Sequence, residues 1–177
     1  ALSEHLANEA LAALGMTRTV QTLGLPIGGG AGFPTTQQAE RDWTARYGAD
    51  VGAERAEVLL GRYGTKATFV IDAIAGWAGA DAPLAAAPSS SRAEIDHLVR
   101  TEHVAHLSDV FLRRTSLAFT GSISVALIHE IGEIVANALG WSPNRRSEEE
   151  DAFQAELATA HRVNLESGDG SEAAALR

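Results

Sequence analysis

The stretch EIDHLVRTEHVAHLSDVFLRRT, residues 94–115, decides the fold of this 177-residue chain. Two helical patterns meet within it, near Leu107 and Ser108. Each pattern places apolar side chains three or four residues apart, which is the spacing of one face of an α-helix. These apolar positions are Ile95, Leu98 and Val99 in the first pattern, and Leu107, Val110 and Phe111 in the second. The stretch therefore predicts two helices that turn a corner.

Charged side chains gather at this corner. Ser108 is a suitable N-cap for the second helix, and Asp109 then lies in the first turn, where a helix favours negative charge. Asp109 and Arg113 are four residues apart, with the acid before the base, as helices prefer. Because guanidinium groups bind carboxylates through two hydrogen bonds at a time, we expect a partly buried acid–arginine cluster here. Its expected members are Glu102, Asp109, Arg113 and Arg114.

Composition is that of an ordinary globular protein, with 45% hydrophobic and 21% charged residues. Aromatic residues make up only 6%, while alanine and leucine are frequent, which favours helices. Basic residues number 14 against 23 acidic ones, a net charge of −9, which argues against nucleic acid or anionic lipid as a main partner. The absence of cysteine excludes disulfides and thiolate metal sites and fits a reducing, cytoplasmic compartment.

Helical periodicity along the chain predicts an all-α fold, a compact bundle of about six to seven helices preceded by an extended connector. Residues 1–35 are interpreted as a linker helix and that connector, and residues 36–164 as the helical domain. Residues 165–177 have little to bury and are expected to be a disordered tail. Residues 80–91, rich in proline, serine and alanine, are expected to be a linker or mobile loop.

Helix ends in the second half of the chain are marked by capping residues. Ser122 is expected to open a helix that Gly140 ends, with Trp141 folded back on the last turn. Ser147 and Glu150 have the spacing of a capping box for the next helix.

Glycine is concentrated in residues 28–32, and glycine-rich loops cradle phosphate groups in many proteins. Phe33 stands where the third glycine of a dinucleotide-binding motif is required, and no buried strand precedes the run. We therefore interpret the run as a flexible connector.

Histidine and glutamate occur together at two places. His129, Glu130 and Glu133 resemble half of a zinc-protease motif, but the second histidine is missing, and they lie on the polar face of their helix. His103 and His106 could chelate a metal with Glu102, although surface histidines are the more common outcome. A small metalloenzyme built on His103, His106, His129 and Glu133 remains an alternative.

Four motifs, in order along the chain, resemble the C-terminal helical domain of FAD-dependent (aerobic) glycerol-3-phosphate dehydrogenases. They are the helix of residues 2–14 with Leu25-Pro26, the turn LLGRYGT of residues 59–65, the elements RTEH of residues 100–103 and DVFLRRT of residues 109–115, and LGW of residues 139–141 with Arg145 or Arg146. One departure is Ser116, where this family commonly has a basic residue.

The resemblance implies that the parent enzyme oxidises glycerol 3-phosphate to dihydroxyacetone phosphate and passes electrons through FAD to quinone, or to oxygen in the oxidase branch of the family. The flavin and substrate sites would lie in an N-terminal flavin domain that this chain lacks, so we assign no catalytic, cofactor-binding or metal residue here. The fragment is expected to be inactive alone, with a role in packing, oligomer contacts or docking. A homo-oligomeric parent with peripheral membrane association is expected. Structural or domain-contact candidates are Glu102, Asp109, Arg113, Arg114 and Trp141.

The main alternative is a stand-alone helical module that binds a separate protein. Its contact surface would contain Trp43, Tyr47 and Leu25.

Overall fold

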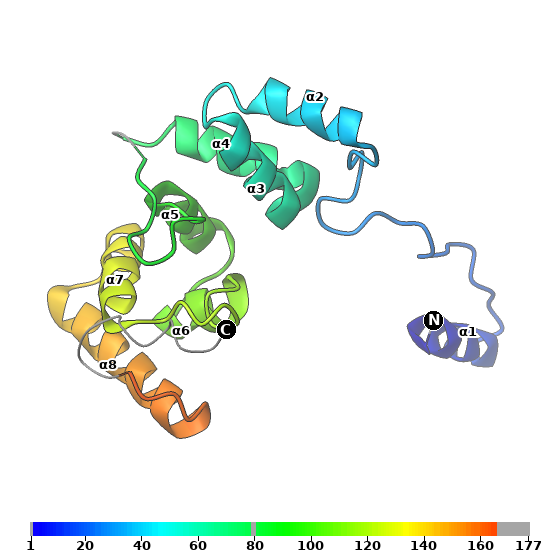
Figure 1. Cartoon of the computed structure of the whole chain (residues 1–177). Coiled ribbons are helices and arrows are strands. Elements are labelled where there is room, and N and C mark those ends of the chain that lie inside the picture. Colours follow the sequence, from blue (N-terminus) through cyan, green and yellow to red (C-terminus); the bar gives the residue numbers. More distant parts are fainter. Residues whose placement is uncertain (1, 79–80, 166–177) are drawn as a thin grey trace, which may run out of the picture.

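The computed structural model describes residues 2–78 and 81–165 (Figure 1). Within these ranges the chain forms helices, turns and loops and no strand, so the all-α prediction is confirmed. The elements are α1 (Leu2–Ala13), α2 (Gln37–Tyr47), α3 (Ala53–Tyr63), the single 3-10 turn η1 (Gly64–Lys66), α4 (Ala67–Ala75), α5 (Arg92–Thr101), α6 (Leu107–Asp109), the π-helical turn η2 (Val110–Arg114), α7 (Val125–Leu139) and α8 (Pro143–Ala160). None of these helices combines the length and apolar character needed to cross a membrane.

The helices α2, α3 and α4 form one layer around a small apolar core (Figure 1). Its buried members are Leu59, Ala67, Val70 and Ile71. Trp43 and Tyr47 of α2 cover this core, with their ring centroids 4.7 Å apart. The turn between α3 and α4 is short, so the two helices pack against each other as a hairpin.

The helices α5 to α8 enclose the larger core. Both stripes predicted from residues 94–115 are buried in it, and α7 packs between α5 and α8. At its centre Phe111 of η2 stacks on Phe153 of α8, with ring centroids 4.7 Å apart. The described residues therefore contain two apolar cores, and polar contacts must help to join them.

The helix α1 stands apart from both layers and is joined to them by residues 14–36 (Figure 1). No residue of α1 is buried. The predicted tail, residues 165–177, lies outside the described residues except for Leu165, which packs partly buried against the larger core.

The glycine run is not the flexible connector that the sequence predicted. Its Gly29 carbonyl accepts hydrogen bonds from the backbone N–H and the hydroxyl of Thr65, at 2.9 and 3.0 Å. A Cβ atom on Gly29 would lie 2.0 Å from the carbonyl oxygen of Tyr63, and one on Gly64 would lie 2.4 Å from the carbonyl oxygen of Gly29. The glycines thus allow the connector backbone to lie directly against the turn between α3 and α4.

The prediction of a linker or mobile loop at residues 80–91 was wrong for its described part, residues 81–91. Leu84 and Ala87 are buried in the larger core, and the Leu84 N–H donates to the Ser90 carbonyl at 2.9 Å. The Arg92 N–H donates to the Ala82 carbonyl at 3.0 Å. Proline and serine form turns here rather than a free linker, because one leucine anchors the loop in the core.

Two helix starts also differ from the sequence prediction. Helix α7 is capped by Ser124 rather than Ser122, since the Ser124 hydroxyl accepts from the Leu127 N–H at 3.2 Å. Helix α8 is capped by Ser142 rather than Ser147, and Pro143 occupies its first turn, where a missing N–H costs nothing.

The Phe111–Phe153 stack generates the first prediction. We expect Phe111→Ala to lower the free energy of unfolding by about 3–5 kcal/mol, because it leaves a cavity in the larger core. Phe119→Ala is the matched control, since Phe119 is 86% exposed and its loss should change stability by less than about 0.5 kcal/mol. Chemical denaturation monitored by circular dichroism measures both, and equal values for the two variants would contradict the described core.

Candidate functional site

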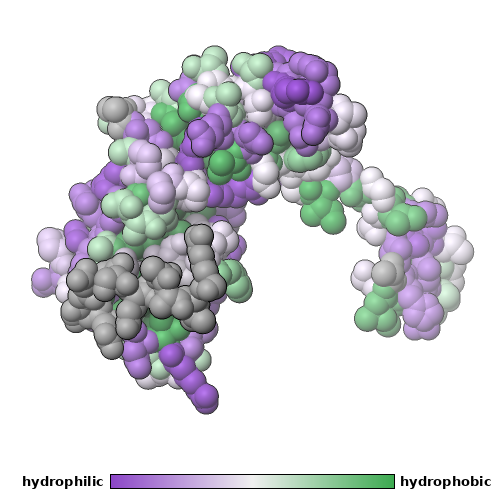
Figure 2. Space-filling view, viewed as in Figure 1, coloured by the Kyte–Doolittle hydropathy of each residue, from purple (hydrophilic) through white to green (hydrophobic). Residues whose placement is uncertain are grey.

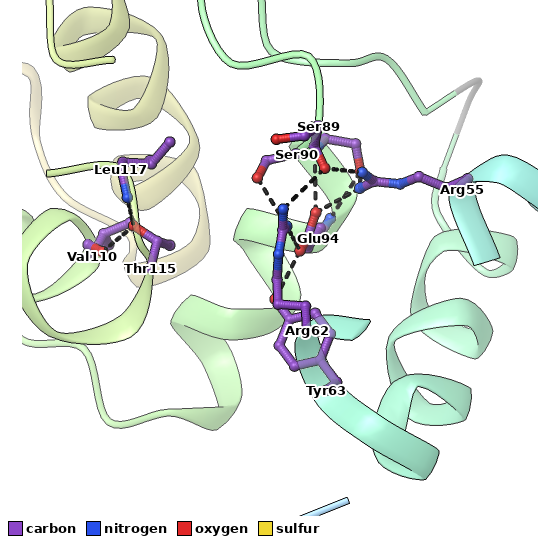
Figure 3. Close-up of polar contacts among 10 residues, drawn as sticks. Arg55, Arg62, Tyr63, Ser89, Ser90, Glu94, Val110, Thr115 and Leu117 are labelled. Atoms are coloured by element: carbon purple, nitrogen blue, oxygen red, sulfur yellow. Dashed lines mark hydrogen bonds and ion pairs between the residues drawn. The ribbon is translucent and has the colours of Figure 1, made fainter. Parts of the chain in front are cut away.

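The most buried charge in the described chain is the carboxylate of Glu94, which is 1% exposed. It accepts hydrogen bonds from Arg55 at 2.5 Å, from Arg62, and from the Tyr63 hydroxyl at 2.7 Å (Figure 3). The backbone N–H of Ser91 is a fourth donor at 3.4 Å. We call Glu94, Arg55, Arg62 and Tyr63 the Glu94 cluster.

Local sequence explains why these groups meet. Ser91 and Glu94 form a capping box at the start of α5, which fixes the carboxylate at the helix N-terminus. Arg55 and Arg62 are seven residues apart on α3, about two helical turns, so both face the same neighbour. Tyr63 adds its hydroxyl at the end of the same helix. Because Glu94 belongs to the larger core and α3 to the smaller one, the Glu94 cluster joins the two layers.

The electrostatics follow from burial and charge. Burial raises the pKa of the Tyr63 phenol above its usual value, and the negative charge of Glu94 raises it further. Burial alone would lower the pKa of Arg62, but the charge and hydrogen bond of Glu94, together with Tyr63, outweigh it and leave that pKa raised. At neutral pH the Tyr63 phenol is therefore neutral and the Arg62 guanidinium is charged.

The serine loop completes this arrangement. Arg55 also donates to the Ser89 carbonyl, and Arg62 donates to the Ser90 hydroxyl at 3.0 Å. These bonds hold residues 88–91 against α3, which explains why the loop is ordered.

The acid–arginine cluster expected at residues 102–114 is only partly present. Glu102 is exposed at the C-terminal end of α5, and its carboxylate has no hydrogen bond or ion pair among the described residues, so its predicted burial was wrong. The physical reason is that α5 ends at Thr101 and turns at His103, whose φ is 54°, which directs Glu102 to solvent. Asp109 and Arg113 do form an ion pair.

Within the motif of residues 100–103, Arg100 rather than Glu102 forms an acid–arginine pair. It donates to both carboxylate oxygens of Asp96, at 2.8 and 3.0 Å, and to the Ala138 carbonyl of α7 at 3.2 Å. The bidentate bond to Asp96 raises the pKa of Arg100. Arg100 therefore ties α5 to the end of α7.

Asp109 serves mainly to fix the backbone of the corner. Its Oδ2 accepts from the N–H groups of Ala105 and His106 at 3.0 and 2.9 Å. Burial opposes ionisation, but these two bonds and Arg113 outweigh it, so the pKa of Asp109 is lowered. The N-cap is thus His106 rather than the predicted Ser108.

A second buried carboxylate reaches the same corner from α8. Glu149 accepts from the Leu107 N–H at 2.9 Å and lies 3.0 Å from His106 Nδ1. Burial raises the pKa of Glu149, but the backbone bond and the neighbouring His106 and Arg145 lower it overall. The corner is therefore supported by α8, which sequence spacing did not indicate.

Trp141 behaves as predicted. Gly140 adopts a left-handed conformation with φ 69°, and the Trp141 N–H donates to the Ala136 carbonyl at 2.9 Å. The indole packs partly buried on the larger core and lies 5.7 Å from the Arg145 guanidinium. Arg114 is exposed and has no partner among the described residues.

The polar face of α7 is used for internal contacts. His129 Nδ1 lies 2.5 Å from Glu150 of α8, while Glu130 and Glu133 pair with Arg92. Among the described residues, no group of three histidine, cysteine, aspartate or glutamate side chains could hold a metal ion.

Sequence reasoning missed the Glu94 cluster, although the signals were present. Ser91 and Glu94 have capping-box spacing, and Arg62 and Tyr63 lie in a quoted motif. The pairing of α3 with α5 could not be read from local spacing, because the partners are about thirty residues apart. The carboxylates of the Glu94 cluster and of the corner are saturated by hydrogen bonds, so they support structure rather than proton transfer.

Residues 20–146 match the model of a family described as the C-terminal domain of alpha-glycerophosphate oxidase. The match begins within the connector, at residue 20, and covers both layers up to the start of α8, with every member of the Glu94 cluster. A comparison with curated proteins finds no match.

The Glu94 cluster gives the second prediction. Glu94→Ala removes the shared partner of two arginines and should lower the free energy of unfolding by about 3–5 kcal/mol. The matched control is Glu102→Ala, at the exposed C-terminal end of the same helix, which should change it by less than about 0.5 kcal/mol. Urea denaturation compares the two, and similar losses would show that Glu94 does not join the layers.

The third prediction concerns acid. The pKa values of Asp109 and Glu149 are lowered from 3.8 and 4.5, so these carboxylates stabilise the fold fully above the unfolded values. As the pH falls from about 5 to 3 the unfolded state binds more protons, and this stability is lost as the pH passes through the folded pKa values. We expect Glu149→Gln to lose less stability than the unaltered chain over this range, as measured by urea denaturation at each pH. An equal loss would contradict the described corner.

Proposed function

We propose, because this chain belongs to the family of the C-terminal domain of alpha-glycerophosphate oxidase, that it is the helical accessory domain of a flavin-dependent enzyme that oxidises glycerol 3-phosphate to dihydroxyacetone phosphate. In this proposal FAD, held in the parent's flavin domain, accepts the hydride and passes electrons to quinone. The observation that carries the proposal is the family match through the connector, both layers and the corner. In this proposal the domain itself packs against the flavin domain and supports it, and it carries no catalytic residue.

The N-terminal segment supports a docking role. A helix of twelve residues is marginally stable in water unless its apolar face is covered. The apolar side chains of α1 and the connector are instead exposed, and Figure 2 shows them as green patches along this arm. They are Leu2, Leu6, Leu14, Met16, Val20, Leu23, Leu25 and Ile27. In the parent, we place the flavin domain against this face.

Polar contacts orient the arm for such docking. Glu4 accepts from Arg18 at 3.0 Å and from the backbone N–H and hydroxyl of Thr22 at 3.0 and 2.7 Å. These bonds to Thr22, the largest contribution, lower the pKa of Glu4 to about 2, so it stays charged at neutral pH. By helical spacing, Glu4 lies on the face of α1 opposite Leu2 and Leu6. The connector therefore folds against the polar face and leaves the apolar face available.

The remaining parts of the proposal concern the parent enzyme. We place it in the cytoplasm as a homo-oligomer, with peripheral attachment at the inner face of the membrane, where quinone is the electron acceptor. The alternative of a stand-alone interaction module keeps only Leu25 of its expected contact surface exposed, because Trp43 and Tyr47 pack partly buried on the smaller core.

The fourth prediction tests the parent activity and the docking face together. The full-length product of the gene that encodes this chain should bind FAD, and glycerol 3-phosphate should bleach its flavin absorbance, while the 177-residue chain alone should remain colourless. In the full-length protein, Leu6→Glu with Leu14→Glu should expose the connector and speed its cleavage by trypsin.

The matched control is Val163→Glu, an exposed apolar position far from the arm in sequence, which should leave cleavage unchanged. A full-length product without flavin, or one that glycerol 3-phosphate does not reduce, would overturn the proposed activity. Unchanged cleavage of the double variant would overturn the docking face.

A further inference from the structure

A cleft of about 460 Å³ lies beside the Glu94 cluster, between the two layers. One wall is formed by Arg62 and the serine loop, and the other by residues 113–117 (Figure 3). Figure 3 shows the two walls facing each other, with Arg62 and Ser90 on one side and Thr115 on the other. Pockets of this size commonly hold small molecules.

The charge of this cleft is one-sided. Among the described residues that line it, Arg62, Arg113 and Arg114 are charged and none is acidic. Arg62 pairs with Glu94 and Arg113 pairs with Asp109, and both acids are buried and accept further hydrogen bonds. In a chain whose net charge is −9, three arginines around one cleft concentrate positive potential where anions are attracted.

The arginines keep unused donors toward the cleft. A guanidinium group has five N–H donors. Arg113 spends one on Asp109, and Arg114 has no partner among the described residues. Arg62 donates to Glu94, Ser90 and Ser89 and retains further N–H groups. Pairing with local acids therefore leaves N–H donors of all three arginines unused. Such pairing alone does not explain why three arginines line the cleft.

The walls are fixed before any ligand arrives. The Thr115 hydroxyl donates to the Val110 carbonyl at 2.7 Å and accepts from the Leu117 N–H at 3.4 Å, which closes the end of η2 (Figure 3). Leu117 is buried in the larger core. On the opposite wall Arg62 is held by Glu94. Such preorganisation reduces the entropy lost on binding.

We propose that this cleft binds the phosphate group of a small phosphate monoester. Arginine forks match phosphate oxygens bidentately, and the hydroxyl groups of Ser89, Ser90 and Ser116 add neutral donors on both walls. The dianion is favoured over a single carboxylate because three cations face it and only two buried acids lie behind them. This inference goes beyond the proposed function, which assigns no ligand to the domain, and it does not depend on flavin chemistry.

The fifth prediction uses the 177-residue chain and two probes, inorganic phosphate and methyl phosphate, at constant ionic strength set with sodium chloride. Both should shift the backbone amide signals of Ser89, Ser90 and Ser116 in a saturable manner by nuclear magnetic resonance. Arg114→Gln should weaken binding by about tenfold, because it removes a charged donor. Since Arg114 has no partner among the described residues, this variant should keep the melting temperature of the unaltered chain.

The control is Arg41→Gln, an exposed arginine on α2 that does not line this cleft and should bind phosphate as the unaltered chain does. Unsaturable shifts spread over all surface arginines would overturn the proposal. Equal binding by the Arg114→Gln variant, or equally tight binding of succinate, would also overturn it. Each of these outcomes leaves the proposed oxidation of glycerol 3-phosphate untouched, because that activity is measured on the full-length protein.

Discussion

The buried carboxylate of Glu94 joins two helical layers that do not share an apolar core. A single charge in such a place is costly unless it is paired, and here two arginines, a phenol and a backbone N–H satisfy it. The same bonds hold the serine loop and align α3 with α5. One interaction therefore fixes both the relative position of the layers and the wall of the cleft between them.

A second constraint is the corner at residues 102–110, where three chain segments meet. Asp109 accepts hydrogen bonds from two N–H groups of the loop before α6. Glu149, on α8, accepts a third from the N–H of Leu107. Acids rather than arginines thus organise the backbone here. Arg113 and Arg114, which follow, are exposed and line the cleft, and this connects the structural role of the corner to the proposed binding of phosphate.

The arm formed by α1 and the connector differs from the two layers, because its apolar side chains are exposed rather than buried. Its polar face is covered by contacts among Glu4, Arg18 and Thr22, whereas its large apolar side chains, such as Leu2 and Leu6, stay exposed. Farther along, Gly29 lies backbone to backbone on the turn at Gly64 and Thr65, so the arm leaves the domain from a defined point. A rigid exit followed by an uncovered apolar face is what a domain needs if it is to be seated on a larger neighbour.

Periodicity and motifs in the sequence determined the all-α class, the two apolar stripes of residues 94–115, the helix end at Gly140 with Trp141 folded back, and the family resemblance, because each depends on residues within one or two helical turns. Local spacing could not reveal that Glu102 faces solvent, since that depends on where α5 stops and how His103 turns. Nor could it reveal the order in residues 81–91, which Leu84 anchors in a distant core. Only the tertiary structure brought Arg62 to Glu94 and opposite Arg114, because charges pair according to which helices pack together and not according to their separation along the chain.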